Sequence, residues 1–258
     1  MGLGWTFVLE LAAVIVYMTV WFVVAMWRRR NDVADVAWGL GFVLVGSTSL
    51  LLHTPAGGRS MLVTALVAAW GIRLALHIHL RNRVKPEDFR YRQWREQWGT
   101  SVLIRSYLQV FLLQGVLLVL VSTPVIHVNS VINPELGYGD VLGVLIWSIG
   151  FLFEAVGDYQ LMRFAGNPRN KGRIMTSGLW RLTRHPNYFG EVVLWWGIFL
   201  IVLSAPGGWR TIVGPVTITL LILQVSGIPM LEARYRGNAQ YDAYRRSTSS
   251  FFPLPPRT

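Results

Sequence analysis

Residues 177–197, SGLWRLTRHPNYFGEVVLWWG, gather side chains that bind anions and exchange protons. The polar members of this segment are Arg181, Arg184, His185, Asn187, Tyr188 and Glu191. Pro186 stands where a helix would begin, because proline is favoured at the first position of a helix. A helix N-terminus beside arginines attracts anions, since its free backbone N–H groups and its dipole both favour negative charge. The segment therefore predicts an anion-binding site at the start of a helix.

Further ionisable residues lie inside apolar runs, where each costs about 2.5–3.5 kcal/mol to insert into a membrane. They are Glu10, Asp35, Arg73, His77, Arg105, Glu154, Asp158 and Glu191. Residues four apart share a helix face, so Glu154 and Asp158 form one polar stripe, and Asn187 and Glu191 form another. All of these except Glu10 fall toward one predicted side of the membrane. A polar ligand at that depth would account for them, and buried ion pairs that lock a helix bundle are the alternative.

Two loops combine arginine with aromatic and amide side chains. LRNRVKPEDFRYRQWREQWG covers residues 80–99, and RFAGNPRNKGRIMTSGLWRLTRHPNY covers residues 163–188. Arginine pairs bidentately with phosphate, aromatic rings offer stacking faces, and asparagine offers an amide edge. This mixture favours a nucleotide ligand, although merely solvated loops would also be basic. The sequence has neither a GxGxxG nor a Walker A motif, so no standard soluble nucleotide-binding fold is expected.

Composition indicates the kind of elements that position these side chains. The chain has 258 residues, of which 53% are hydrophobic and 13% aromatic, and only 14% are charged against about 25% in soluble domains. A membrane-spanning helix needs about 20 apolar residues. Seven segments qualify, at residues 5–27, 33–52, 61–80, 103–125, 141–164, 188–203 and 211–231. We therefore predict an all-α polytopic membrane protein, a bundle of seven transmembrane helices in a single domain over residues 1–258.

The distribution of charge predicts the orientation of this bundle. The net charge is +11, and nearly all Lys and Arg fall in residues 28–30, 81–100, 163–185 and the tail after residue 232. These segments alternate with nearly uncharged loops, so the positive-inside rule places the N-terminus outside and the C-terminus in the cytoplasm. The short outer loops suit a bacterial inner membrane. Basic residues between apolar spans do not indicate nucleic-acid binding, and the absence of cysteine excludes thiolate nucleophiles and Cys-ligated metals. No metal site is predicted.

Several of these stretches resemble a known family. SGLWRLTRHPNYFGE, FEAVGDYQLMRF and EARYRGNAQYDAYRRSTSSFFPL resemble the C-terminal domain of the steroid 5-alpha-reductase family, most closely its bacterial seven-span members. RNRVKPEDFRYRQWR and DVADVAWGLGF resemble the loop after the third span and the second span of those members. The resemblance implies a C-terminal reductase region at residues 141–258. It also implies NADPH-dependent reduction of a carbon–carbon double bond conjugated to a ketone, typically in a 3-oxo-4-ene steroid that enters from the bilayer.

The resemblance also implies which residues contact the cofactor and the substrate. Asp158, Asn187 and Glu191 match the family most tightly. Together with the basic loops, they make the full set of candidate NADPH-binding residues Arg81, Arg90, Tyr91, Glu154, Asp158, Arg163, Asn167, Arg173, Arg184, His185, Asn187, Tyr188, Glu191, Glu232, Tyr235 and Tyr244.

The reaction needs a hydrogen-bond donor at the ketone oxygen, where negative charge develops as hydride adds to the beta carbon. In the family, an acid on the second span and a tyrosine on the third span polarise this oxygen. Asp35 is the matching acid, since a carboxyl in an apolar site can act as a neutral donor. The third span, LALHIHLRNR, has no tyrosine, so His79, or Tyr107 on the fourth span, is predicted to take its place. A simple interaction of Asp35 with the helix dipole near Arg30 is the alternative.

Two other functions remain open. A membrane methyltransferase of the isoprenylcysteine carboxyl type also carries an RHPxYxG segment and a late acidic and aromatic tail, which Glu232, Tyr241 and Tyr244 would fit. S-adenosylmethionine has no phosphate, so the many basic residues favour NADPH, whose 2'-phosphate calls for arginine. A transporter would place polar residues at the bilayer midplane or in broken repeated helices, and the sequence shows neither pattern. The natural substrate and the oligomeric state are not predicted.

Overall fold

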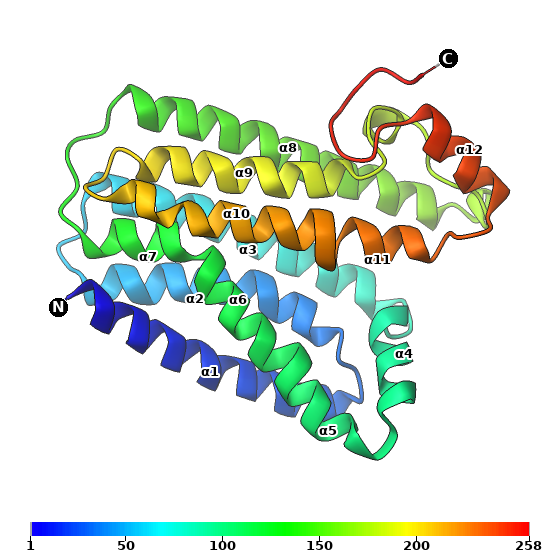
Figure 1. The fold of residues 1–258 in the computed structure, drawn as a ribbon, viewed down its shortest axis with the longest axis horizontal. Helices are drawn as coiled ribbons and strands as arrows, with labels where there is room; N and C mark the ends of the chain where they lie inside the picture. The colour runs from blue at the N-terminus through cyan, green and yellow to red at the C-terminus, as the bar shows by residue number, and fades with distance from the viewer. Residues whose placement is uncertain (1, 258) are drawn as a thin grey trace. The chain divides into compact units, whose positions relative to one another are not determined.

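The computed structural model describes residues 2–257, and within that range it contains helices and no strand. Two stretches of this range form an isolated bridge between Thr183 and Ser249. Within the described residues, seven helices are long and apolar enough to cross a membrane, which confirms the predicted all-α bundle of seven spans (Figure 1). The orientation of the bundle in the membrane stays a prediction.

The chain divides into two compact units, which are described separately. Unit 1 comprises Met1–Asp140 and Ile201–Gly214, and unit 2 comprises Val141–Leu200 and Pro215–Thr258. Helix α8, Tyr138–Gly166, begins in unit 1 and continues through unit 2.

Unit 1 is built on the pair α2 and α3, with α1 against α2. Its elements are α1 Leu3–Arg28, α2 Val33–Leu52, α3 Gly58–Arg83, α4 Phe89–Trp98, η1 Gly99–Ser101, α5 Val102–Arg105, the π-helical η2 Ser106–Leu112, α6 Leu113–Val121, α7 Thr123–Ser130 and η5 Gly208–Ile212. A Cβ atom added to Gly39 would lie 2.7 Å from the Gly71 carbonyl oxygen. The backbones of α2 and α3 therefore touch where both helices carry glycine, as small residues allow in membrane helices.

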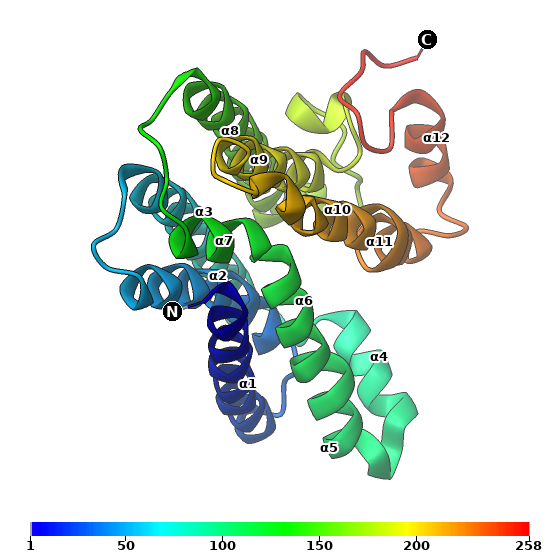
Figure 2. The ribbon, with the colours of Figure 1, turned by 60° about the vertical axis from the view of Figure 1, so that its left-hand side comes forward.

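The fourth span differs from its predicted range of 103–125. Figure 2 shows α4 and α5 joined by a turn, with α6 continuing in line from α5. The helix then ends at Val121, and α7 begins at Thr123. Pro124 in the first turn of α7 cannot donate a backbone hydrogen bond to the preceding turn, and its ring clashes with that turn. The apolar run is therefore continuous in sequence while the helix is interrupted at Ser122.

Unit 2 is built on the antiparallel pair α8 and α9, which lie side by side in Figures 1 and 2. Helix α9 is Pro186–Val202, and the further elements are η3 Pro168–Asn170, η4 Gly178–Arg181, α10 Val213–Leu220, the π-helical η6 Leu221–Val225, α11 Ile228–Ala233 and α12 Ala239–Ser247. The end of α9 and the start of α10 belong to unit 1. Helix α9 begins at Pro186, which confirms the predicted helix start. Cβ atoms added to Gly150 and Gly197 would each lie within 2.6 Å of the opposite backbone, so glycine sets the α8–α9 spacing.

The seventh span is likewise interrupted, although the sequence predicted one helix over residues 211–231. The π-helical η6 ends at Val225, and α11 starts anew at Ile228. Gly227 between them has φ −82° and ψ −100°, outside the helical region. Pro229 follows in the first turn of α11, where its missing N–H costs nothing. The glycine and the proline together end one helix and start the next.

Candidate functional site

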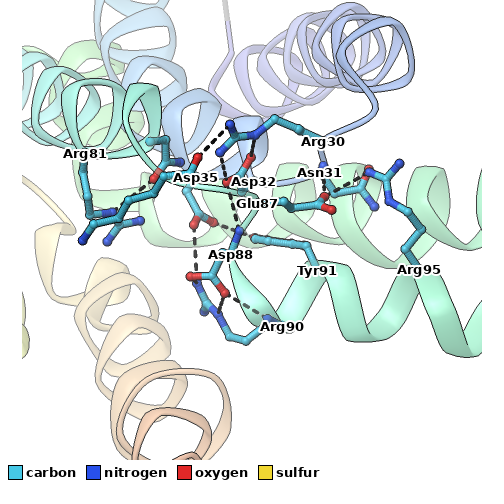
Figure 3. Close-up of polar contacts among 12 residues, drawn as sticks. Arg30, Asn31, Asp32, Asp35, Arg81, Glu87, Asp88, Arg90, Tyr91 and Arg95 are labelled. Carbon is cyan, nitrogen blue, oxygen red and sulfur yellow. Dashed lines mark hydrogen bonds and ion pairs between the residues drawn. The ribbon is translucent and has the colours of Figure 1, made fainter. Parts of the chain in front are cut away.

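An acid–tyrosine site in unit 1 joins the start of α2 to α4. We define it by Asp35, Arg90, Tyr91 and Gln114. The Tyr91 hydroxyl donates to Asp35 Oδ1 at 2.6 Å (Figure 3). On the other side, Gln114 Nε2 donates to the Tyr91 oxygen at 3.2 Å. Tyr91 is only 3% exposed. The phenol is therefore held by an acceptor on one side and a donor on the other, in a place from which bulk water is largely excluded.

Arg90 supplies positive charge to this site. Its Nη2 lies 3.4 Å from Asp35 Oδ2, and its Nε donates to Asp88 Oδ1 at 3.0 Å. Asp88 also caps α4, because the same Oδ1 accepts from the backbone N–H of Arg90 at 3.0 Å. Burial by itself would raise the pKa of Asp88, but hydrogen bonds and positive charge from Arg90 outweigh it and hold the pKa below its usual value.

A second layer of ion pairs fixes α4 to the start of α2. Arg30 donates to both carboxylate oxygens of Asp32, at 3.0 and 2.8 Å, and Asp32 Oδ2 accepts from the backbone N–H of Asp88 at 3.1 Å. Glu87 accepts from the backbone N–H of Asn31 and from an arginine on α4 (Figure 3). The loop before α2 and the loop before α4 are thereby tied together, and Tyr91 is positioned against Asp35.

The three predicted catalytic residues, Asp35, His79 and Tyr107, do not lie together in the structure. Asp35 lies in the first turn of α2, and Arg30 bonds to Asp32 rather than to it. His79 is exposed on α3. The Tyr107 hydroxyl pairs with Thr19 Oγ1 at 3.0 Å. Neither His79 nor Tyr107 is brought to Asp35, and the tyrosine whose hydroxyl bonds to Asp35 is Tyr91 of α4.

Tyr91 had been predicted to bind the cofactor, so its pairing with Asp35 was missed. The signal was present in the sequence as Pro86 and Asp88 just before an aromatic and arginine-rich stretch, a helix N-terminus pattern in which Asp88 is the cap. Among the other residues predicted from this loop region, Arg90 joins the site, while Arg81 donates to the neighbouring Asn82 at 3.1 Å.

In unit 2, Arg184 and Glu232 bind the segment before α9 to α11 and α12. Arg184 Nε donates to Glu232 Oε1 at 2.9 Å, and Nη1 donates to the backbone carbonyls of Thr248 at 2.6 Å and Arg245 at 3.3 Å. Arg184 is 7% exposed. Because most of its hydrogen bonds go to other residues of the protein, Arg184 holds the segment before α9 against α11 and the end of α12.

His185 lies beside the same carboxylate. Its Nε2 is 3.0 Å from Glu232 Oε1, so Nε2 carries the hydrogen and donates. Burial lowers the pKa of His185, and the Glu232 carboxylate opposes that effect only in part, so the ring is neutral at pH 7. Nδ1 is then a free acceptor, and it has no hydrogen-bond partner among residues 2–257. A buried acceptor of this kind suits a hydroxyl or amino group of a ligand.

These residues border a cavity of about 340 Å³, which we name the RHP cavity. Its walls are Leu161, Phe164, Ala165, Asn170, Lys171, Gly172, Arg173, Ile174, Met175, Trp180, Arg184, His185, Leu231, Tyr235, Tyr241 and Tyr244. The rings of Tyr235 and Tyr241 stack with centroids 4.5 Å apart, and the Tyr244 hydroxyl donates to the Trp180 carbonyl. Aromatic faces, a buried acceptor and the cations Lys171 and Arg173, beside Arg184 that is paired with Glu232, fit part of a nucleotide, since the faces stack on a base and the cations meet phosphate.

Of the residues predicted to bind a cofactor, five line the RHP cavity, namely Arg173, Arg184, His185, Tyr235 and Tyr244. Tyr188 stacks on His185 with ring centroids 5.6 Å apart. Arg163 and Asn167 are exposed, and Asn167 caps the turn at Arg169. Lys171 and Trp180 also line the cavity and were not predicted, although both stand in the basic loop at residues 163–188.

The polar stripes on α8 and α9 meet one another outside the cavity lining. Asn187 Nδ2 donates to Asp158 Oδ1 at 3.2 Å. Glu154 and Asp158 are buried, and Glu191 is half-buried. The spacing of four residues on each helix therefore does place both stripes within unit 2, where α8 and α9 pack.

Comparison with known proteins gives a family and one short similarity. The family described as "Protein of unknown function (DUF1295)" matches residues 21–248. A stretch of 60 residues is 44% identical to the "Probable O-methyltransferase ustE" of Ustilaginoidea virens, and this stretch covers 23% of the chain and 20% of that protein. No solved structure matches. Because the family match extends over most of the sequence, this chain belongs to the DUF1295 family.

Proposed function

We propose that this membrane protein reduces a carbon–carbon double bond conjugated to a ketone in a steroid or similar lipid, with NADPH as cofactor. The observation that carries the proposal is the 2.6 Å hydrogen bond between Tyr91 and Asp35, with Gln114 on the other side of the phenol. An acid and tyrosine pair of this kind would polarise a ketone oxygen, which supports the proposal. The sequence resemblance to the steroid 5-alpha-reductase family supports the same chemistry.

The acid–tyrosine site would stabilise the charge that develops on the substrate. NADPH, when bound, would supply a hydride to the beta carbon of the enone. As negative charge grows on the ketone oxygen, the Tyr91 hydroxyl would turn from Asp35 to donate to it, and Asp35, once protonated, would then donate to the phenol oxygen. A proton must then reach the alpha carbon to complete the saturated ketone. Arg90, 3.4 Å from Asp35, adds positive charge to the same place. Preorganised donors of this kind act strongly because the site excludes water.

The RHP cavity would hold part of the cofactor. Trp180 and Tyr235 offer ring faces to the adenine, and Lys171 and Arg173 offer charge to phosphate. The free Nδ1 of His185 would accept from a ribose hydroxyl. In this proposal the cavity faces the cytoplasm of a bacterial cell, where NADPH is made, and the lipid substrate arrives from the bilayer.

A second candidate function is methyl transfer from S-adenosylmethionine. It is favoured by the 60-residue similarity to a protein named as a probable O-methyltransferase. The RHP cavity also fits this cofactor in part, because the Nδ1 acceptor and the tyrosine rings suit an adenosine without phosphate. The two cations Lys171 and Arg173 favour NADPH.

Equilibrium binding to the purified full chain tests the proposal. NADPH should bind, and Lys171→Ala or Arg173→Ala should weaken its binding, because both side chains line the RHP cavity. Asp35→Ala should keep NADPH affinity and lose turnover of an enone, because Asp35 belongs to the acid–tyrosine site and not to the RHP cavity. A chain that binds S-adenosylmethionine and ignores NADPH would reverse the order of the two candidates.

A further inference from the structure

Glu10 is an ionisable residue of the first span that the proposed function does not use. It is fully buried, at 0% exposure, and lies about 10 Å along α1 from Leu3 at 1.5 Å per residue. Its hydrogen-bond partner, Thr48, lies near the end of α2, whereas the acid–tyrosine site lies at the first turn of α2. An ionisable side chain inside a membrane span is costly, and it commonly marks a functional group.

The hydrogen bonds around Glu10 do not suit a carboxylate. Thr48 Oγ1 lies 2.9 Å from Oε1 and 2.8 Å from Oε2, and it also lies 2.8 Å from the Leu44 carbonyl oxygen. One hydroxyl hydrogen would have to serve three acceptors. Among residues 2–257, no Lys, Arg or His forms an ion pair with Glu10, so an ionised carboxylate would remain uncompensated in an apolar interior.

A protonated carboxyl satisfies the same geometry completely. Thr48 then donates to the Leu44 carbonyl, and the Glu10 hydroxyl donates to Thr48 Oγ1, which has lone pairs left to accept. We propose that Glu10 is an intramembrane proton-binding site that holds its proton at neutral pH. This inference is independent of the proposed reductase function.

A polar route leads from Glu10 toward one end of α1. Thr6 is one helical turn away on the same face and is fully buried, and its hydroxyl pairs with His53 Nε2 at 2.9 Å. His53 follows the end of α2 and is half-buried. Thr6 and His53 thus lie between Glu10 and the end of the helix pair, and they provide the path by which the proton exchanges.

Other titratable groups on the elements packed against α1 have partners of their own. Asp35 of α2 bonds to Tyr91, and Tyr107 of η2 bonds to Thr19. His127 of α7 bonds to the Pro206 carbonyl at 2.8 Å. None of the three bonds to Glu10, so its protonation is set by Thr48 and the surrounding apolar side chains.

Infrared difference spectroscopy of the purified full chain at pH 7 tests the protonation. Subtracting the spectrum of Glu10→Gln should reveal the carbonyl absorption of a protonated carboxyl, and Thr48→Val should move this band to higher wavenumber because the acid loses its acceptor. Glu96→Gln is the matched control, since Glu96 is exposed on α4 and should contribute only carboxylate absorption. If Glu10→Gln also removes only carboxylate absorption, the proposal is wrong.

A second measurement needs no variant. A lipid-soluble carbodiimide adds a protonated carboxyl across its C=N bond, so the peptide containing Glu10 should gain the mass of one reagent. Labelling confined to exposed acids would count against the site.

A third measurement tests the exchange path. In D2O, Thr6→Val should slow the isotopic shift of the Glu10 infrared band several-fold, and an unchanged rate would remove Thr6 and His53 from the path.

Discussion

Tyr91 and Tyr107 are two tyrosines of unit 1 whose hydroxyl groups have different partners. The Tyr91 hydroxyl is held between Asp35 and Gln114, and Tyr91 is buried on a helix whose cap and ion pairs fix its position. Tyr107 is a tyrosine of the same unit whose hydroxyl bonds to Thr19 instead. The two residues therefore form a matched pair for testing which phenol takes part in the reaction.

Tyr91→Phe should lower turnover of an enone by about 10²–10³-fold, the loss typical when one donor to a developing oxyanion is removed. NADPH affinity should not change, because Tyr91 does not line the RHP cavity. Tyr107→Phe should leave turnover within a few-fold of the wild type. Steady-state kinetics would measure the turnover, and titration with NADPH would measure the affinity. Normal turnover in Tyr91→Phe together with a large loss in Tyr107→Phe would refute the assignment of Tyr91.

His185 makes stability depend on pH. Its pKa is lowered in the folded protein, so the unfolded chain, with a pKa of about 6.5, takes up the proton more readily. The stabilising effect of the neutral ring is present above about pH 6.5 and is lost as pH falls from there toward the folded pKa. The melting temperature of the wild type, measured from pH 8 down to pH 5, should therefore fall as the pH drops below about 6.5.

His185→Gln provides the control for this prediction. Glutamine keeps a donor for Glu232 and does not titrate, so the melting temperature should fall less steeply over the same range than in the wild type; burial also lowers the pKa of His53, which accounts for part of the remaining slope. Asp88 acts in a separate window, because a lowered carboxyl pKa gives stability that is lost only as pH falls below about 3.8. An equally steep fall in His185→Gln between pH 8 and 5 would place the titrating group elsewhere.

At the scale of elements, α4 and the helix breaks are what the sequence predicted least well. Residues 81–100 were predicted as a loop because their mean polarity is high, whereas Asp88 caps a ten-residue helix there. The apolar runs predicted the spans, but they did not predict that the fourth span is interrupted at Ser122 and the seventh at Gly227, because hydrophobicity does not report backbone geometry. The start of α9 at Pro186 was predictable because proline has a specific position in helices.

Removing the cap of α4 should loosen the acid–tyrosine site. Asp88→Ala should cost about 1 kcal/mol in unfolding free energy, typical of a lost N-cap, and should raise hydrogen exchange in α4. Asn238→Ala removes the cap of α12 and is the matched control. Its exchange should rise in α12 alone. Faster exchange spread evenly over both helices in either variant would contradict a local role for the caps.

The contact between α8 and α9 depends on glycine. A Cβ at Gly190 would lie within 2.5 Å of the Glu154 backbone nitrogen, so Gly190→Ala should destabilise the protein by about 1–3 kcal/mol, as overpacking does. Gly166→Ala at the end of α8 is the control, because a Cβ there meets nothing within 4 Å. Thermal melts of both variants should separate them, and equal melting temperatures would show that the helices can move apart at little cost.

For the whole molecule, the sequence predicted the number of spans and the membrane character, because both follow from apolar composition and length. It did not predict which loop side chains meet. Tyr91 and Asp35 are 56 residues apart, and Arg184 and Glu232 are 48 apart. Local periodicity reports helices and faces, whereas such pairs depend on how the helices pack. The division into two compact units follows from the same packing.

Hydride transfer from NADPH to a conjugated enone is the reaction that we propose for this chain. The most direct test incubates the purified full chain with a 3-oxo-4-ene steroid and NADPH that carries deuterium at the transferring position, followed by mass spectrometry and NMR of the product. We predict a saturated ketone with deuterium on the former beta carbon, and little product from Tyr91→Phe. Recovery of unreduced enone from every lipid enone tried, with the cofactor intact, would contradict this proposal.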